Sequence, residues 1–498
     1  MLILKRLKES FKNNFERDWL ESRGIRLKIL RDEFEGDVVE EYEVGLATVK
    51  IVESNFYYYI VSEPELNDRE VEAYYKVMYK LYFSLKSDPK RAVKCVLRSI
   101  ENENNVDPEK VSYYVLRDTL GYGVLDTFIK DDEVEDISVD GMGRPLRVFH
   151  RRFSDLGWLF TNLKFENEEE LDKYATLLAY KGGKSVNVAF PVAEGLLPEK
   201  YRVMVTYRYE VSPLGSSFVI RKPFKEPLTL PWLIHLRMLS PLMASYLWTL
   251  LELKGAIFIT GEMASGKTTL LNAILMFLPP NWKILTIESS PEIFLPHPGW
   301  KPLVTRFSVS VNHTPIPEYS LFDLVRVALR ERADVIVIGE VRGEEARYLA
   351  QAIATGHSGA TTFHSDSIDS MVSRLVSPPI EMSRIFLPLI SSAVTRYVKI
   401  PRRKPLRRVI KVGEIMNEDG EYIEVFEWRA EEDEFEPNDA SDIVKRSVKL
   451  VDRAKVVGWS KRDLIEEIES RREFIEGLVK RRVFKFADVV NEVQRFFR

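Results

Sequence analysis

Hydrophobic residues in the second half of the chain form short continuous runs separated by stretches with helical periodicity. Ala256–Thr260 is such a run, and the apolar residues after it recur at helical spacing from Leu270 until Pro279. A short apolar run predicts a buried strand, whereas a spacing of three and four residues predicts a helix. Further runs occur at Lys283–Ile287, at Asp334–Ile338 and between His357 and His364. This alternation predicts an α/β fold with a parallel sheet.

The rest of the pattern predicts four regions. Residues 1–106 are predicted to be mostly helical, with two short strands within 44–61 and a surface available for partner docking. Residues 107–225 combine helical and strand patterns and predict a smaller α+β domain. Residues 226–236 are predicted to be a linker, because the overlapping stretch from 223 to 231 holds three prolines in nine residues. Residues 237–498 are predicted to form the α/β domain, ending in a hairpin and charged helices.

Composition narrows the class of protein. The 498 residues are 45% hydrophobic and 30% charged, which is typical of a globular protein, and the formal net charge of −4 gives no general reason to bind nucleic acid. The single cysteine, Cys95, excludes an internal disulfide and a four-cysteine zinc site, and favours a reducing cytosol. The longest apolar run, Pro241–Leu253, is too short to span a bilayer. We therefore expect a cytoplasmic protein whose membrane contact is peripheral.

A glycine-rich loop follows the first of the apolar strands. Gly261 to Thr268 matches the pattern G-x-x-x-x-G-K-[ST] between a predicted strand and a predicted helix, which is the context of a P-loop. Its backbone N–H groups and the helix N-terminus suit a phosphate. Lys267 offers a charge to the β- and γ-phosphates of ATP, and the Thr268 hydroxyl offers a ligand to Mg²⁺. The predicted nucleotide contacts are Gly261, Glu262, Met263, Ala264, Ser265, Gly266, Lys267, Thr268 and Thr269.

Acidic residues lie where two of the other predicted strands end. Glu340 follows the run from Val335 to Ile338 and holds the Walker B position, where a carboxylate meets the metal or the attacking water. Gly339 stands where the general Walker B pattern has an aspartate. Glu288 follows the strand that ends at Ile287. Because the carboxyl ends of parallel strands share one edge of a sheet, we expect these acids to lie near the P-loop.

These motifs, in this order, resemble the ATPases of type II secretion and type IV pilus assembly. The resemblance covers roughly 107–415 and rests on the P-loop, the box ILTIESSPE at 284–292, the segment LVRVALRERADVIVIGEVRG at 324–343 and the box ATGHSGATTFHSD at 354–366. The segment RDTLGYGVLDTFIKDDEVEDISVDG and the lack of a four-cysteine insert are similar to the archaeal branch. The resemblance implies a RecA-like ATPase domain preceded by a PAS-like α+β domain.

Residue roles follow from the resemblance. It implies that Glu340 polarises the attacking water or holds Mg²⁺, and that His364 senses the γ-phosphate with His357 as its partner. In the acidic box Ser289 stands at the aspartate position, so Glu288 is the preferred general base, with Glu292 left open. The resemblance also implies that two arginines approach the phosphates when the domains close, namely Arg202 and Arg221. Other candidates for that role are Arg326, Arg330 and Arg342.

The implied function is a homohexameric motor that uses ATP and Mg²⁺ and docks on a polytopic membrane platform protein. It would drive assembly of a pilus or archaellum, or secretion. Two alternatives remain open at this point: a nucleic-acid translocase of the conjugation type, and a scaffold subunit that binds ATP without hydrolysing it. The acidic net charge argues against the first, and no nucleic-acid partner is expected. Intact Lys267, Thr268 and Glu340 argue against the second.

Overall fold

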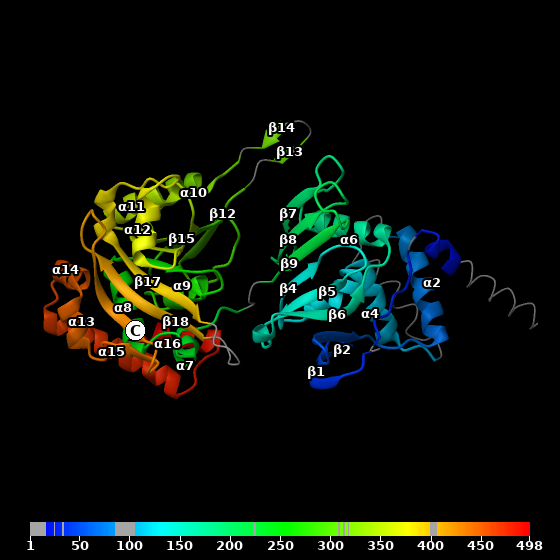
Figure 1. Ribbon diagram of the computed structural model, residues 1–498, viewed down its shortest axis with the longest axis horizontal. Helices are drawn as coiled ribbons and strands as arrows, with labels where there is room; N and C mark the ends of the chain where they lie inside the picture. Colours follow the sequence, from blue (N-terminus) through cyan, green and yellow to red (C-terminus); the bar gives the residue numbers. More distant parts are fainter. Residues whose placement is uncertain are drawn as a thin grey trace, which may run out of the picture. The chain divides into compact units, whose positions relative to one another are not determined.

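The computed structural model describes residues 16–498 except 24, 32–33, 85–104, 223–225, 307–308, 312–313, 317 and 399–405 (Figure 1). Two parts of the region predicted to be mostly helical, residues 1–15 and 85–104, lie outside the described residues, and Cys95 is among them. The chain divides into two compact units, Met1–Phe224 and Lys225–Arg498, and each is described by itself.

The first unit is built on a nine-stranded sheet with helices packed against it. Its strands lie in the order β1-β2-β3-β6-β5-β4-β9-β8-β7. The strands are β1 (Asp37–Val44), β2 (Ala47–Glu53), β3 (Tyr57–Ser62), β4 (Val134–Val139), β5 (Pro145–His150), β6 (Trp158–Lys164), β7 (Val192–Leu196), β8 (Arg202–Thr206) and β9 (Ser217–Arg221). The helices are α2 (Asp68–Ser84), α4 (Pro108–Thr119), α5 (Asp126–Lys130) and α6 (Glu168–Lys181), with 3₁₀ turns η1 (Gly123–Leu125) and η2 (Ser154–Leu156).

The N-terminal region contributes more sheet than the sequence predicted. The two strands expected within 44–61 are present as β2 and β3, but β1 precedes them, and its many glutamates concealed the alternation. β3 pairs in parallel with β6, so one sheet runs across the boundary predicted between residues 106 and 107. The prediction of a mostly helical region at 1–106 therefore missed β1, whereas the two strands that it included are confirmed. These strands are an integral part of the first unit.

A buried ion pair also crosses that boundary. Arg117 on α4 donates two hydrogen bonds from Nη1 to the Glu63 carboxylate, at 2.6 and 2.7 Å, and both side chains are 1% exposed. Arg117 also donates to Asp118 and to the backbone carbonyl of Lys28. With its donors satisfied in this way, the buried guanidinium ties α4 to the segments before α2.

The second unit has a nine-stranded sheet in the order β12-β11-β15-β16-β10-β17-β18-β19-β20, of which the first six strands are parallel. The strands are β10 (Ala256–Gly261), β11 (Ile284–Glu288), β12 (Trp300–Val304), β15 (Val335–Val341), β16 (Ser358–His364), β17 (Ile390–Val398), β18 (Leu406–Ile415), β19 (Tyr422–Arg429) and β20 (Glu434–Glu436). A separate hairpin is formed by β13 (Val309–Val311) and β14 (Thr314–Ile316).

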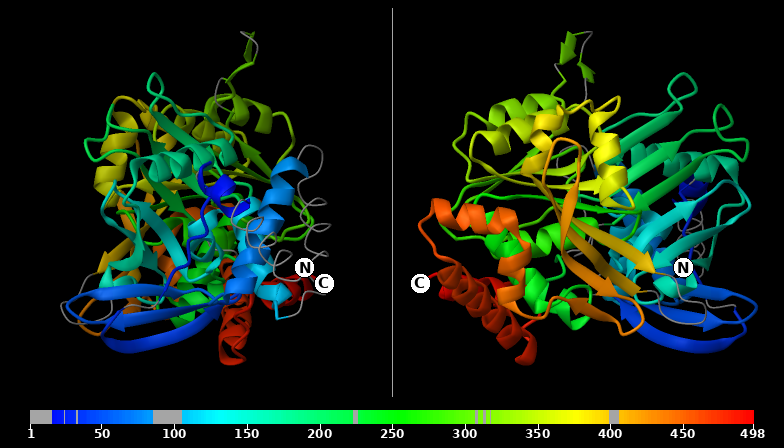
Figure 2. Two further views of the ribbon diagram at one scale, coloured as in Figure 1. Left: turned by 90° about the vertical axis from the view of Figure 1, so that its right-hand side faces the viewer. Right: turned by 60° about the vertical axis from the view of Figure 1, so that its left-hand side comes forward.

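Helices cover both faces of this sheet and bury two hydrophobic cores. In Figure 2 the orange and red C-terminal helices lie together as one layer of the second unit. This is a doubly wound, RecA-like α/β arrangement, as predicted. One layer holds α7 (Leu230–His235), α8 (Pro241–Glu252), α9 (Lys267–Leu275), α13 (Ala440–Arg446), α14 (Val448–Val456), α15 (Lys461–Lys480) and α16 (Phe486–Phe496), and the other holds α10 (Leu321–Ala328), α11 (Glu345–Ala354), α12 (Ile368–Val376) and the 3₁₀ turn η3 (Arg384–Leu389).

The predicted linker at 226–236 is largely part of the second unit. Its residues 230–235 form α7, and Leu230 is fully buried in the core that α8 and α15 share. The Thr229 hydroxyl donates to the backbone carbonyl of Phe484 at 2.9 Å. The prolines suggested an exposed connection, but the apolar residues between them give this segment a face to bury.

We expect Arg117→Met to lower the free energy of unfolding by about 3–5 kcal/mol, because it leaves the Glu63 carboxylate buried without its partner. Urea denaturation measures this change. The control is Arg17→Met, which removes an exposed ion pair with Glu21 and is expected to cost less than about 1 kcal/mol. Equal effects of the two substitutions would contradict the assignment of Arg117 as a structural anchor.

Candidate nucleotide-binding site

The carboxyl ends of four parallel strands bring the predicted site residues to one edge of the second unit's sheet. β10 ends at Gly261, which is paired in register with His364 at the end of β16. Glu340 on β15 is paired with Thr362 of β16, and Glu288 is the last residue of β11. The crevice outside the carboxyl ends of such strands is the usual ligand position in an open α/β sheet.

The P-loop is held tightly on its inner side. A Cβ atom on Gly261 would lie 2.3 Å from Thr395 Oγ1 and 2.5 Å from Ser265 Oγ, so only glycine fits there. The Ser265 hydroxyl donates to the backbone carbonyl of Glu262 at 2.8 Å and lies 2.8 Å from Thr395 Oγ1. Gly266 has φ +91° and caps α9, a conformation that favours glycine. Glu262, Met263 and Ala264 are exposed, and Thr268 and Thr269 are partly exposed.

Lys267 folds back against the loop. Its Nζ donates to the backbone carbonyl of Glu262 at 2.7 Å and lies 3.5 Å from His364 Nδ1. Burial lowers the pKa of Lys267, while the charge of Glu340 acts in the opposite direction. The ammonium group is therefore close to His364, the residue predicted to sense the γ-phosphate.

Glu340 lies between a histidine and an arginine. His364 Nε2 is 2.9 Å from Glu340 Oε1, and Arg342 donates to Glu340 Oε2 at 2.6 Å. Burial, followed by the charge of Lys267, lowers the pKa of His364 below its usual value. The neutral form of His364 is thereby favoured, and its Nδ1 is placed to accept from Lys267 Nζ. The arrangement places a carboxylate, a neutral imidazole and an ammonium group at the mouth of the P-loop.

Glu288 occupies the space that an aspartate at position 339 would need. A Cβ atom on Gly339 would lie 2.8 Å from Glu288 Cγ and 3.1 Å from Glu288 Oε1. Glu288 Oε1 accepts hydrogen bonds from the backbone N–H groups of Glu292, at 2.9 Å, and Ile293, at 3.0 Å. Burial raises the pKa of Glu288 to about 7 in spite of these bonds. The carboxyl group missing from β15 is thus supplied by the neighbouring strand.

Several predicted residues lie away from this cluster. His357 precedes Ser358, the first residue of β16, so the length of the strand, about 20 Å, separates it from His364. His357 is therefore not a neighbour of His364 within this unit, and its role in the histidine box stays a prediction. Glu292 is exposed, with its backbone N–H bonded to Glu288. Arg326 and Arg330 lie exposed on and just after α10.

Arg202 and Arg221 belong to the first unit. They are neighbours in register on β8 and β9. Arg202 contacts Glu194 at 2.5 Å, and Arg221 makes two bonds to the Asp136 carboxylate, at 2.8 and 3.1 Å. Both side chains remain substantially exposed. Their approach to the phosphates stays a prediction.

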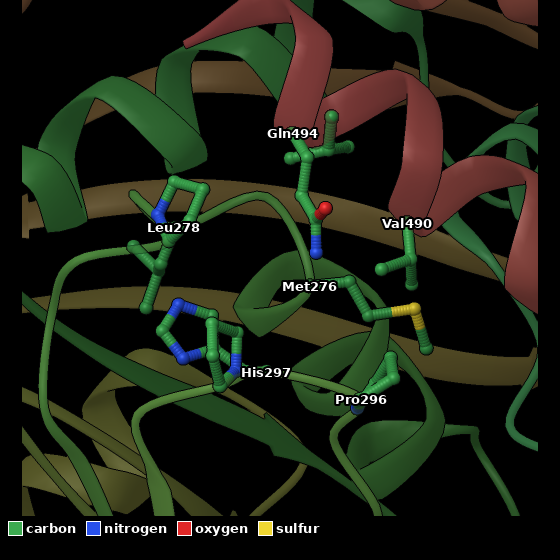
Figure 3. Close-up of a pocket in the computed structure, with 9 residues that line it drawn as sticks. Met276, Leu278, Pro296, His297, Val490 and Gln494 are labelled. Carbon is green, nitrogen blue, oxygen red and sulfur yellow. The ribbon is translucent and has the colours of Figure 1, made fainter. Parts of the chain in front are cut away.

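A small hollow of this unit lies near the end of α9, apart from the cluster of predicted site residues. Figure 3 shows Met276, Leu278 and Val490 around it, with His297 at its side. His297 Nε2 is 2.9 Å from the carbonyl of Pro279, and Nδ1 accepts from Gly299 N–H at 3.1 Å. Both ring nitrogens therefore bond to the backbone, so this histidine secures the loop around Pro296 to the end of α9.

Sequence reasoning missed the residues that support the site from β17. Thr395 contacts Ser265 and donates to the Thr260 carbonyl at 2.9 Å. Thr395 lies about 130 residues beyond the P-loop and has no motif of its own. Only the pairing of β17 with β10 brings it there.

Comparison with known proteins decides the family. The model for the family "Type II/IV secretion system protein" matches residues 184–408. The uncharacterized protein MJ0900 of Methanocaldococcus jannaschii is 36% identical over 416 residues, which is 81% of this chain and 73% of that protein. The chain belongs to the type II/IV secretion ATPase family. The prediction from the motifs is confirmed, and the archaeal relative agrees with the predicted branch.

Two further proteins are similar to this chain over part of its length. The type IV secretion system protein VirB11 of Brucella suis is 27% identical over 275 residues, which is 50% of this chain and 74% of that protein. A crystal structure of the pilus retraction motor PilT with bound ADP is 20% identical, covers 68% of this chain and 93% of that one, and has a TM-score of 0.37. Among the described helices of this chain, none has the length and apolarity to cross a bilayer.

The raised pKa of Glu288 gives the stability of the folded protein a specific pH dependence. Between pH 4.5 and about 7 the folded protein holds a proton on Glu288 that the unfolded chain has released, so stability falls as pH rises through this range. From pH 5 to pH 8 this loss amounts to about 2–3 kcal/mol. Glu288→Gln keeps the acceptor oxygen and removes the titration.

We therefore expect the unfolding free energy of Glu288→Gln, relative to that of the native protein, to rise by about 2–3 kcal/mol from pH 5 to pH 8. Urea denaturation of both proteins at the two pH values measures it. A difference that is the same at both values would show that Glu288 titrates normally.

Proposed function

We propose that this chain is an ATP-hydrolysing motor that uses Mg²⁺ and works as a homohexamer. The observation that carries the proposal is that His364 lies beside a P-loop with Lys267 Nζ 3.5 Å from its Nδ1 and Glu340 Oε1 2.9 Å from its Nε2. A scaffold that only binds nucleotide needs the loop, but it does not need a carboxylate held against a neutral histidine. Membership in the secretion ATPase family supports the same conclusion.

The residues at the sheet edge fit Mg·ATP. In the proposal, the loop from Gly261 to Thr269 surrounds the phosphates and Lys267 neutralises the β- and γ-phosphates. Mg²⁺ prefers oxygen ligands, and the partly exposed Thr268 hydroxyl and the Glu340 carboxylate are the oxygen donors proposed to hold it, directly or through water. When bound, the ion would neutralise charge on the transferring phosphoryl group.

We propose Glu288 as the general base and Glu340 as the group that orients the attacking water. A base works best when its pKa lies near the working pH, and the pKa of Glu288, about 7, meets that condition. Two backbone N–H groups fix its carboxyl group in one orientation. Glu292 is exposed and makes a poorer candidate, because an ordinary carboxylate in water is a weak base at pH 7. His364 is proposed to sense the γ-phosphate as a neutral hydrogen-bonding group.

The larger assembly is proposed from the family. Arg202 and Arg221 would stabilise charge on the γ-phosphate in the transition state, which would couple hydrolysis to domain movement. The hexamer would sit at the inner face of the cytoplasmic membrane as a peripheral protein, docked on a polytopic platform protein. Its work would be the assembly of a type IV pilus-like filament, such as a pilus or archaellum, or the secretion of a substrate. No nucleic-acid partner is proposed.

We expect Glu340→Gln to bind ATP with nearly native affinity and to hydrolyse it at least about a hundredfold more slowly, because the amide does not polarise water. Phosphate release and equilibrium binding of ATP measure the two properties. The matched control is Glu344→Gln, an exposed glutamate in the turn before α11, which should hydrolyse ATP at the native rate. Native turnover by the Glu340 variant would refute its assignment.

We expect specific ATPase activity to rise with protein concentration, in proportion to the fraction of hexamer, because ring assembly completes the site. Parallel measurements of hydrolysis and of mass by sedimentation velocity check this. Full activity in a species with the mass of one chain would contradict the need for a ring. Added DNA should leave the rate unchanged, and stimulation at moderate salt would favour a translocase.

A further inference from the structure

The P-loop has a second flank, opposite the catalytic residues. β10 lies between β16 and β17 in the sheet. β16 and β15 carry His364 and Glu340, so the γ-phosphate end of a bound nucleotide belongs on that side. A nucleotide anchored there by its terminal phosphate must direct its nucleoside away from β15. That direction leads past the P-loop to β17 and β18.

Tyr397 and Arg407 lie on this second flank. They are register partners on β17 and β18, and the Arg407 guanidinium carbon lies 4.9 Å from the centre of the Tyr397 ring. Arg407 Nε donates to the backbone carbonyl of Ala264 in the P-loop at 2.9 Å. Tyr397 lies two residues beyond Thr395, which contacts Ser265 of the loop. Alternate residues of a strand share a face, so Tyr397 continues the face on which the loop sits.

The second glycine of the loop is part of the same surface. A Cβ atom on Gly266 would lie 3.1 Å from Met238 Cε and 3.6 Å from Arg407 Cδ. Met238 is 3% exposed, and its backbone carbonyl accepts from Val409 N–H on β18 at 2.8 Å. The first turn of α9 is thus bordered by an apolar methionine and a guanidinium.

Arg408, the next residue on β18, has a structural role and provides a comparison for Arg407. Arg408 is buried, and it makes two hydrogen bonds to the Asp433 carboxylate, at 2.8 and 3.0 Å. Arg407 is exposed, and among the described residues it forms no ion pair with a carboxylate. Its planar group contacts a loop carbonyl and an aromatic ring instead. An exposed, planar cation beside an aromatic ring is a surface on which a nucleobase stacks.

We propose that Tyr397 and Arg407 form the nucleoside subsite, on which the purine base of ATP stacks, with Met238 closing its inner side. This inference rests on the proposed nucleotide binding and adds the residues that distinguish a nucleotide from a bare polyphosphate. The phosphates would be held by the P-loop, and the base by the tyrosine–arginine pair. A bound base would also fix Arg407 against the Ala264 carbonyl and so hold the outer part of the loop.

The test compares two ligands that share the phosphates but differ in the nucleoside. Isothermal titration with Mg²⁺ measures the affinity for a non-hydrolysable ATP analogue and for inorganic tripolyphosphate. The native protein should bind the analogue at least about tenfold more tightly than tripolyphosphate. Tyr397→Ala should weaken the analogue about tenfold and leave tripolyphosphate unchanged. Tyr397→Phe keeps the ring and should bind the analogue with native affinity.

Two controls separate the subsite from other effects. Tyr422→Ala removes another half-buried tyrosine that faces a cation, Lys411, on the next pair of strands, and it should change neither affinity. Lys267→Ala should weaken both ligands. If Tyr397→Ala weakens both ligands equally, or neither, the subsite is refuted. Failure of the native protein to bind either ligand refutes nucleotide binding itself.

A labelling experiment on the native chain covers the case in which Tyr397→Ala does not fold. Photolysis with 8-azido-ATP should attach label to the peptide that contains Tyr397 or to the one that contains Arg407. Excess ATP should prevent the labelling, whereas excess tripolyphosphate should reduce it only at higher concentration. Label confined to peptides from other parts of the chain would refute the subsite.

Discussion

The central constraint in this molecule is the pairing of one short strand, β10, with a parallel strand on each side. Gly261, where that strand becomes the P-loop, is in register with His364 on one side and with Thr395 on the other. The backbone of Thr395 is so close that a Cβ at position 261 would lie 2.4 Å from its carbonyl oxygen. Close packing at a glycine therefore fixes the loop relative to both flanks. The catalytic cluster and the proposed nucleoside subsite both depend on this register.

A second constraint is the packing of a titratable side chain on β11, Glu288, against Gly339 on the neighbouring strand β15. Glu288 needs the space above Gly339, and its burial there raises its pKa to about 7. The same burial that makes the carboxyl group a suitable base makes its charged form costly for the fold. Two backbone N–H groups offset part of that cost. Stability is thus lowered locally at a residue whose proposed role requires a shifted pKa.

The first unit is organised by buried polar contacts as well as by its apolar core. Arg117 joins α4 to Glu63, and Asp131 accepts hydrogen bonds from Tyr42, at 2.6 Å, and from Tyr59, at 2.7 Å. These contacts link strands β1–β3 to the part of the unit that carries Arg202 and Arg221. The N-terminal strands therefore support the same sheet that holds the two arginines.

The sequence alone determined the α/β order of the second unit, the P-loop and the acids and histidine at strand ends, because each depends on local spacing and on the common edge of a parallel sheet. Tertiary structure decided what depends on pairing between distant segments. It placed Glu288 over Gly339, brought Thr395 and Arg407 to the loop, and put His357 at the opposite end of β16 from His364. It also joined β3 to β6 and drew α7 into a core, since strand partners and buried faces are chosen by the whole fold and leave no local signal.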